Sequence, residues 1–171
     1  MPDDSRIFLG LGSNMGDRYQ NLKKGIDLLN NDPHIWVINQ SHVYQSAPLY
    51  NKNQEDFYNM VVEIDTNLIP VDLLTQIKKI EKKAGRDSKS KKNMPRILDI
   101  DILTIGDLQI HSKLLEIPHP GIAERKFVLK PWNDIAPKFR LPEISLTIAD
   151  LLDYTKDESE VRMVLILDKE D

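Results

Sequence analysis

The segment from Leu98 to Ile102 reads Leu-Asp-Ile-Asp-Ile, an alternation of apolar and acidic residues. Successive side chains of a β-strand point to opposite faces, so the alternation predicts a strand with Asp99 and Asp101 on one face. The apolar residues share the other face, which we expect to be core. The two aspartates would stand about 6.6 Å apart along the strand. Like charges at that spacing destabilise a sheet unless a cation separates them, so the acidic face is interpreted as a site.

A strongly basic segment precedes this strand. Residues Lys78 to Arg96 include nine Lys and Arg but only two Asp and Glu, a net charge of +7. The whole chain has 23 basic and 27 acidic residues, so the remainder has 14 and 25, a net charge of −11. Positive charge gathered beside two aspartates indicates a site that attracts a small polyanion.

The two aspartates have two interpretations. Mg²⁺ binds through one or two carboxylates together with substrate phosphates, which suits Asp99 and Asp101. A bare Asp-x-Asp pattern, taken alone, favours an exposed acidic face that forms salt bridges with the loop lysines. The basic loop that leads into the strand reverses this preference and favours a metal-phosphate site.

Length and composition restrict the class of protein. The chain of 171 residues is expected to form one domain over residues 1–171. Hydrophobic residues make up 40% and charged residues 29%, which is typical of a soluble globular protein. No apolar run is long enough for a membrane span, and residues 1–4 do not read as a signal peptide. The absence of cysteine is compatible with a reducing cytoplasm. We expect a cytoplasmic monomer.

Hydrophobic periodicity predicts the element order β-α-β-β-α-β. Strands are expected over residues 7–11, 35–43, 58–64 and 98–102, and helices are expected to begin near Asp17 and Pro70. This order is that of a ferredoxin-like α+β sandwich, whose sheet carries helices on one face and can offer the other face to ligands. After Gly106 the sequence predicts a small hairpin, short helices to Tyr154 and a strand over residues 162–167.

Several other residues are weaker candidates when taken singly. The stretch from Gly12 to Gly16 lacks the ending of a P-loop and reads better as a turn and helix cap. His119, between two prolines, could donate to a phosphate, although a single His in a turn is more often structural. Phe57 is expected in the core unless it pairs with another aromatic residue about a flat ligand. Asn59 faces the same side as Phe57, and its amide suits the edge of a heterocycle.

Four groups of residues occur in order along the chain: Gly12–Gly16; Tyr44–Leu49 with Gln54 and Phe57–Asn59; Glu81, Gly85–Arg86, Pro95–Arg96 and Leu98–Leu103; and Ile117–Pro120 with Arg125 and Phe127–Leu129. Together they resemble the motifs of the 6-hydroxymethyl-7,8-dihydropterin pyrophosphokinase family of folate biosynthesis over nearly the whole chain. The resemblance implies the ferredoxin-like fold, with a ligand cleft across the open side of the sheet.

The resemblance also implies an activity. ATP would transfer its β,γ-pyrophosphoryl group to the pterin's hydroxymethyl oxygen and leave as AMP, with two Mg²⁺ ions held by Asp99 and Asp101. Arg86 and Arg96 would clamp phosphate oxygens. Contacts with ATP are implied for Glu81, Arg96, Ile102, His119 and Arg125. Contacts with the pterin are implied for Ser46, Ala47, Leu49, Phe57, Asn59 and Phe127.

Two functions from other classes compete with this interpretation. A ferredoxin-like sheet with basic loops could bind RNA, but such sheets read bases with exposed aromatic residues on central strands. Aromatic residues are only 6% of this chain, and Asp99 and Asp101 occupy the strand where they would be needed. Nucleic acid is therefore not an expected partner. An Mg²⁺-dependent nucleotidyltransferase could also use an Asp-x-Asp strand. Its products would distinguish it, because it releases pyrophosphate rather than AMP.

Overall fold

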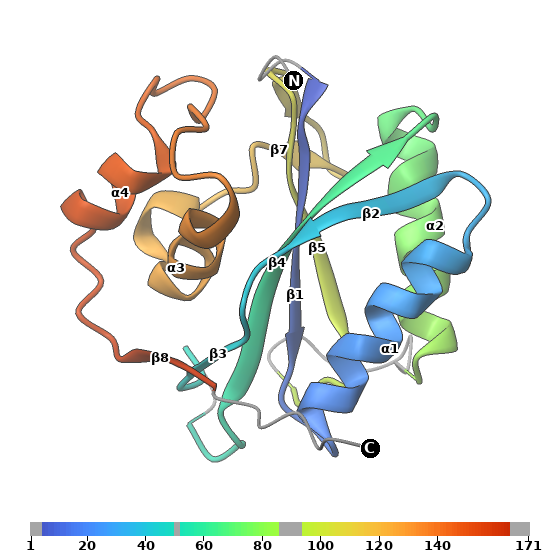
Figure 1. The fold of residues 1–171 in the computed structure, drawn as a ribbon, viewed down its shortest axis with the longest axis horizontal. Helices are drawn as coiled ribbons and strands as arrows, with labels where there is room; N and C mark the ends of the chain where they lie inside the picture. The colour runs from blue at the N-terminus through green and yellow to red at the C-terminus, as the bar shows by residue number, and fades with distance from the viewer. Residues whose placement is uncertain (1–4, 50–51, 86–93, 165–171) are drawn as a thin grey trace.

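The computed structural model describes residues 5–49, 52–85 and 94–164. Its centre is a six-stranded antiparallel sheet in the order β5-β1-β4-β3-β8, with β2 also paired to β4 (Figure 1). The strands are β1 (Ile7–Ser13), β2 (Ile35–Gln40), β3 (Tyr44–Ser46), β4 (Phe57–Thr66), β5 (Asp99–Ile105) and β8 (Val161–Met163). One helix follows β1 and another follows β4. The predicted ferredoxin-like α+β class is confirmed.

The segment 35–43, predicted as one strand, instead ends as β2 at Gln40, and a separate strand, β3, follows it. β2 pairs with residues 62–66 of β4, whereas β3 pairs with residues 57–59. Between the two strands, the Ser41 N–H donates to the Val61 carbonyl at 2.9 Å, and the Ser41 Oγ accepts from the Val61 N–H at 2.9 Å. A side-chain hydroxyl thus replaces a main-chain acceptor, which interrupts the ladder.

Two helices cover one face of the sheet, α1 (Arg18–Asn31) and α2 (Pro70–Lys83) (Figure 1). Asp17 caps α1, because its Oδ1 accepts from the Gln20 N–H at 3.1 Å. The helix α2 begins at a proline and is followed by Gly85 with φ +108°, as the sequence predicts. The core between helices and sheet includes Leu9, Leu22, Leu29, Val62, Ile64, Leu73, Ile77, Leu98, Ile100 and Ile102.

The opposite face of the sheet is partly covered by α3 (Lys126–Ile135) and α4 (Ile148–Tyr154) (Figure 1). A second core lies there, and its centre is an aromatic cluster. The Phe8 ring lies 5.2 Å from the Trp132 ring and 5.0 Å from the Phe139 ring, centroid to centroid. Ligands can therefore reach only the part of this face that α3 and α4 leave open.

The remaining elements are short. The predicted hairpin after Gly106 is formed by β6 (Ile110–His111) and β7 (Glu116–Ile117), and a 3₁₀ helix, η2 (Ile122–Glu124), leads into α3. The late strand expected over 162–167 is β8, and residues 165–167 lie outside the described residues. Within the described ranges, no helix is long and apolar enough to cross a membrane.

The second core should contribute strongly to stability. We expect Trp132→Ala to lower the free energy of unfolding by about 3–5 kcal/mol, because the indole is fully buried and its removal leaves a cavity. Trp36→Ala is the matched control, since Trp36 is 47% exposed, and should cost about 1 kcal/mol or less. Urea unfolding followed by circular dichroism measures both. Equal losses would show that α3 adds little to the core.

Candidate active site

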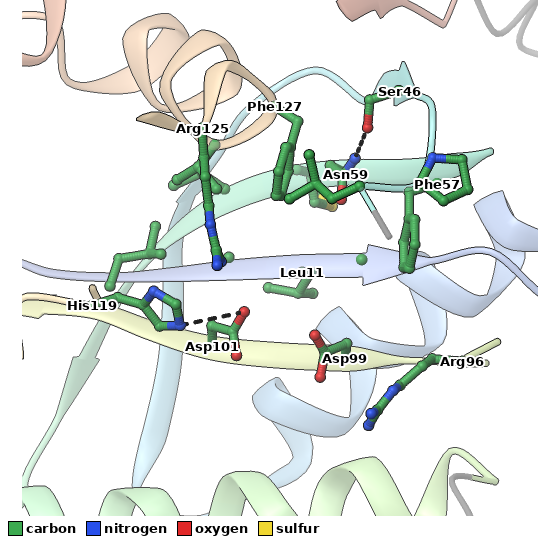
Figure 2. Close-up of a pocket in the computed structure, with 18 of the residues that line it drawn as sticks. Leu11, Ser46, Phe57, Asn59, Arg96, Asp99, Asp101, His119, Arg125 and Phe127 are labelled. Atoms are coloured by element: carbon green, nitrogen blue, oxygen red, sulfur yellow. Dashed lines mark hydrogen bonds and ion pairs between the residues drawn. The ribbon is translucent and has the colours of Figure 1, made fainter. Parts of the chain in front are cut away.

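A pocket of about 460 Å³ occupies the open part of the second sheet face (Figure 2). Its floor is made by β1, β4 and β5, and its walls come from the end of β3 with residues 47–49, from the segment around His119 and from the start of α3. Polar and aromatic side chains occupy different ends of this pocket, so we describe the two ends in turn.

The acidic end is built on β5, where Asp99 and Asp101 both face the pocket (Figure 2). Ile100 lies on the helix side and is buried, so the predicted alternation is confirmed. In the register of β1 with β5, Asp99 lies opposite Gly12 and Asp101 opposite Gly10. Glycine has no side chain, which leaves room on this floor: a Cβ at Gly12 would lie 3.0 Å from Asn59 Oδ1, and one at Gly10 would lie 3.4 Å from the Leu103 side chain. The Gly-Leu-Gly sequence of β1 is the signal for this floor, and the sequence reading overlooked it.

Arg96 lies just before β5 and lines the pocket. Its Nη1 is buried, with no hydrogen-bond partner among the described residues. Its main chain is held by Asn14, whose Oδ1 accepts from the Arg96 N–H at 2.7 Å and whose own N–H donates to the Arg96 carbonyl at 3.0 Å. The Asn14 Nδ2 also donates to Gln54 Oε1 at 2.7 Å. The turn after β1 was interpreted as a helix cap, and Asn14 shows that it also positions Arg96.

The aromatic end is built on β4 and α3. Asn59 is 7% exposed, and its Nδ2 donates to the Ser46 Oγ at 2.8 Å. Phe57 and Phe127 lie on either side of Asn59 in Figure 2, and both line the pocket. The residues after Ser46 complete this wall, which consists of Ala47, Pro48 and Leu49.

At the acidic end, His119 lies beside β5 next to Asp101, and Arg125, the residue that precedes α3, extends into the pocket (Figure 2). The His119 N–H donates to the Leu103 carbonyl at 2.9 Å, and its Nδ1 lies 2.8 Å from the Pro120 carbonyl. A carbonyl can only accept, so Nδ1 carries the proton, and Nε2 lies 4.0 Å from Asp101 Oδ2. Burial lowers the pKa of His119 below its usual value; the hydrogen bond to Pro120 opposes this effect and the charge of Arg125 adds to it. The ring is therefore neutral at pH 7.

Two of the predicted site residues, Glu81 and Ile102, do not line the pocket. Glu81 of α2 is 4% exposed, and its Oε2 accepts from the Ile100 N–H at 2.9 Å, so it supports the strand that carries the aspartates. Ile102 points to the helix side and belongs to the core. Neither side chain reaches the pocket, because Ile102 faces the helix side of the sheet and Glu81 contacts the main chain of β5. Arg86 lies outside the described residues.

The acidic end fits a divalent cation that arrives with a phosphate ligand. Among the described residues, no group of three or more His, Cys, Asp and Glu side chains could hold a metal ion by itself. Two carboxylates on one strand face, with glycines beside them and a buried guanidinium nitrogen nearby, match the way in which Mg²⁺ is bound through few carboxylates and substrate phosphates. The site would thus need the substrate to complete the coordination.

Comparison with known proteins identifies the family. Residues 8–137 match the model of the 7,8-dihydro-6-hydroxymethylpterin-pyrophosphokinase family. The chain belongs to this family. Among bacterial pyrophosphokinases of the family, the 2-amino-4-hydroxy-6-hydroxymethyldihydropteridine pyrophosphokinase of Aquifex aeolicus is 43% identical over 77% of this chain and 80% of its own length. The protein of the same name from Pseudomonas aeruginosa is 36% identical over 81% and 85%.

Eukaryotic relatives of the pyrophosphokinase family are longer. The folic acid synthesis protein FOL1 of Dictyostelium discoideum is 41% identical over 82% of this chain, which spans 21% of that protein. The chain thus spans about a fifth of the length of the first relatives it matches. The Plasmodium falciparum HPPK-DHPS structure with pteroate shares the fold, with a TM-score of 0.70 and 19% identity over 86% of this chain and 42% of the other.

The contact between Asn14 and Arg96 leads to a prediction. We expect Asn14→Ala to speed amide hydrogen exchange at Arg96 at least about tenfold and to lower stability by about 1–3 kcal/mol, because a partly buried N–H loses its acceptor. Exchange followed by NMR measures the first effect and thermal unfolding the second. Asn31→Ala, at an exposed position of α1, is the control and should leave Arg96 exchange unchanged. An unaltered Arg96 rate in Asn14→Ala would contradict the positioning role.

Proposed function

We propose that the chain transfers the β,γ-pyrophosphoryl group of ATP to the hydroxymethyl oxygen of 6-hydroxymethyl-7,8-dihydropterin, a step of folate biosynthesis. The oxygen forms a bond with the β-phosphorus, the bond between that phosphorus and the α,β-bridging oxygen breaks, AMP leaves, and the hydroxyl proton passes to solvent. One observation carries the proposal: a single pocket joins an aromatic, amide-bearing end to an acidic and cationic end. The family match and the bacterial relatives support it.

The aromatic end is suited to the flat pterin. Phe57 and Phe127 would lie against the two faces of the ring, which provides affinity by stacking. Because Ser46 accepts one N–H of the Asn59 amide, the amide has a fixed orientation, with its carbonyl oxygen and second N–H available to the ring edge. A buried amide selects ligands that satisfy it, since an unpaired polar group is costly. Ala47 and Leu49 would line the same slot.

The acidic end is suited to the triphosphate. Asp99 and Asp101 would hold two Mg²⁺ ions, which offset charge on the phosphates and orient the attacking oxygen. Arg96 offers a buried guanidinium nitrogen, Nη1, for phosphate oxygens, and Arg86, which lies outside the described residues, would also clamp them. Arg125 would add a further positive charge. No residue needs to be a strong general base, because positioning and electrostatics carry most phosphoryl-type transfers.

The remaining predicted nucleotide residues are assigned narrower roles. His119 is neutral and donates its Nδ1 proton to Pro120, so it would meet the nucleotide or a metal-bound group through Nε2. Glu81 would act through β5, whose Ile100 N–H it accepts. Ile102 would meet ATP only through its main chain, because its side chain lies in the core.

Product analysis tests the proposal. The protein is incubated with ATP, Mg²⁺ and 6-hydroxymethyl-7,8-dihydropterin, and the nucleotide and pterin products are separated and weighed by mass spectrometry. We expect AMP and pterin diphosphate in equal amounts. Release of pyrophosphate would indicate nucleotidyl transfer instead, and an omission of Mg²⁺ should abolish either product.

The cellular setting is also a proposal. We expect a single domain over residues 1–171 that acts as a cytoplasmic monomer on small molecules, without nucleic acid or membrane partners. The pocket supports action as a monomer, because side chains from one copy of the chain supply both of its ends. A relative from Pisum sativum carries the name of a mitochondrial bifunctional protein.

Because the pocket has an aromatic end and an acidic end, we expect that pterin binding can be weakened without weakening ATP binding. We expect Phe57→Ala and Asn59→Ala to weaken pterin binding by about tenfold or more while ATP binding stays within about twofold, because both side chains belong to the aromatic end. Calorimetry with each ligand measures this. Phe139→Leu, in the second core, is the control for general loss of stability. Equal losses for both ligands would mean that Phe57 and Asn59 support the fold rather than the pterin.

The metal assignment predicts a loss of turnover. Asp99→Asn and Asp101→Asn keep the side-chain shape but remove an anionic ligand, so we expect activity to fall at least about 100-fold. Thermal stabilisation by Mg²⁺ with a non-hydrolysable ATP analogue should disappear as well. Asp107→Asn, at an exposed turn, is the control. An Asp101→Asn protein that keeps both activity and Mg²⁺-dependent stabilisation would exclude the two-metal assignment.

A further inference from the structure

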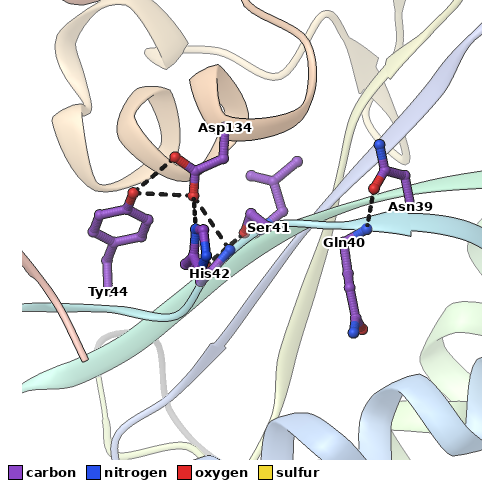
Figure 3. A network of polar contacts seen from close by, with 7 residues as sticks. Asn39, Gln40, Ser41, His42, Tyr44 and Asp134 are labelled. Atoms are coloured by element: carbon purple, nitrogen blue, oxygen red, sulfur yellow. Dashed lines mark hydrogen bonds and ion pairs between the residues drawn. The ribbon is translucent and has the colours of Figure 1, made fainter. Parts of the chain in front are cut away.

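A polar cluster outside the pocket joins α3 to the start of β3 (Figure 3). Asp134 accepts from the Tyr44 hydroxyl at Oδ1 (2.8 Å) and at Oδ2 (3.0 Å). Its Oδ2 also accepts from the His42 main-chain N–H at 3.2 Å and lies 3.1 Å from His42 Nδ1. Tyr44 is 3% exposed and the Asp134 side chain 20%. One carboxylate therefore fastens a helix to a strand through charge-assisted hydrogen bonds.

The place of Asp134 within α3 is locally unfavourable. It lies next to the end of the helix, where the helix dipole already concentrates negative charge. The last turn of α3 holds no basic residue to offset it. A residue that opposes the local preference of its helix is expected to have a tertiary reason. The contacts with Tyr44 and His42 supply that reason.

The Tyr44 hydroxyl is a durable donor. Burial raises the pKa of Tyr44 far above its usual value, and the hydrogen bond to Asp134 and the charge of that carboxylate raise it further. The hydroxyl therefore keeps its proton throughout the neutral range. The hydrogen bond therefore keeps its donor over that range.

The two joined elements carry neighbouring walls of the pocket. α3 presents Phe127 and Val128 in its first turn. β3 ends at Ser46, which holds the Asn59 amide. The helix has ten residues and is about 15 Å long, so a small tilt at the Asp134 end displaces the aromatic ring at the other. Binding between two rings is sensitive to their separation.

We propose that the Tyr44–Asp134 pair is a positioning element for the pterin slot. It fixes α3 against β3 and so sets the place of Phe127 relative to Asn59 and its partner Ser46. Neither member of the pair lines the pocket, so its effect reaches the ligand only through the two walls. The inference deepens the proposed function and rests on it.

A second set of contacts holds α3 in place when the Tyr44–Asp134 pair is removed. Lys130, one turn before Asp134, donates from Nζ to the Val161 carbonyl at 2.7 Å and lies 5.8 Å from the centroid of the Tyr44 ring. Val161 belongs to β8, which pairs with β3. Trp132 and Leu129 also bury α3 in the second core. Loss of the pair should therefore shift the helix rather than unfold it.

Steady-state kinetics of the full chain test the proposal. Tyr44→Phe and Asp134→Ala should each raise the KM for the pterin about five- to tenfold while the KM for ATP stays within about twofold and kcat changes little. The double variant should be no worse than the poorer single variant, because both changes remove the same contact. Asp134→Asn keeps one acceptor oxygen for the hydroxyl and should recover part of the loss. Tyr154→Phe, at a position 71% exposed, is the matched control and should behave as wild type.

The possible results distinguish a failure of the positioning proposal from a failure of the proposed function. An unchanged pterin KM in Tyr44→Phe, equal increases for both substrates, or additive losses in the double variant would each overturn the positioning role. If Tyr44→Phe does not fold, Asp134→Asn and Asp134→Ala provide the same comparison of the two KM values. Failure of the wild-type protein to form AMP and pterin diphosphate would instead refute the proposed function, before any variant is compared.

Discussion

The rest of the structure depends on the register of β5 against β1. In that register Asp99 and Asp101 lie opposite Gly12 and Gly10, and the apolar residues that alternate with them enter the core beneath α1 and α2. A slip of one residue would bury both carboxylates and expose the isoleucines, so the hydrophobic core itself fixes where the charges stand. Glu81 reinforces the arrangement from α2, because it accepts the Ile100 N–H at the free edge of β5. The acidic site is thus a consequence of core packing.

The shape of the pocket depends on the layer that α3 and α4 form over the second face of the sheet. An aromatic cluster holds α3 against the second face of the sheet; its members are Phe8, Trp132 and Phe139. The pocket is the part of that face that remains open. Several residues of this layer lie after residue 137, where the family match ends, including Phe139, Ile148 and Leu151. The segment that follows contributes β8, which extends the sheet beyond β3. Residues beyond the matched motifs therefore support the walls of the site.

Local patterns were sufficient to predict the elements that alternate or repeat strongly. The Asp-x-Asp strand, the two long helices and the shared face of Phe57 and Asn59 follow from periodicity, because each period matches one burial pattern. The break at Ser41 could not be predicted in this way, since it depends on hydrogen bonds with Val61, twenty residues away. The role of Asn14 depends on Arg96 across an even longer separation. The resemblance implied nucleotide contacts for Glu81, and only the packing of α2 shows that its Oε2 accepts from the Ile100 N–H of β5.

An aspartate lies at each end of α3, and the two aspartates have different physical explanations. At the first turn, Asp157 accepts from the Lys126 N–H at 2.9 Å. Burial opposes the charge of Asp157, but hydrogen bonds from Ser159 and Lys126 outweigh it and lower the pKa. The negative charge of this carboxylate lies at the positive end of the helix dipole, and the carboxylate accepts from an N–H that has no partner within the helix. These two local interactions explain its position. Asp134 opposes the dipole at the other end, and nothing local favours it there. Its contacts with Tyr44 account for its position, because they join this end of α3 to the strand that ends at Ser46.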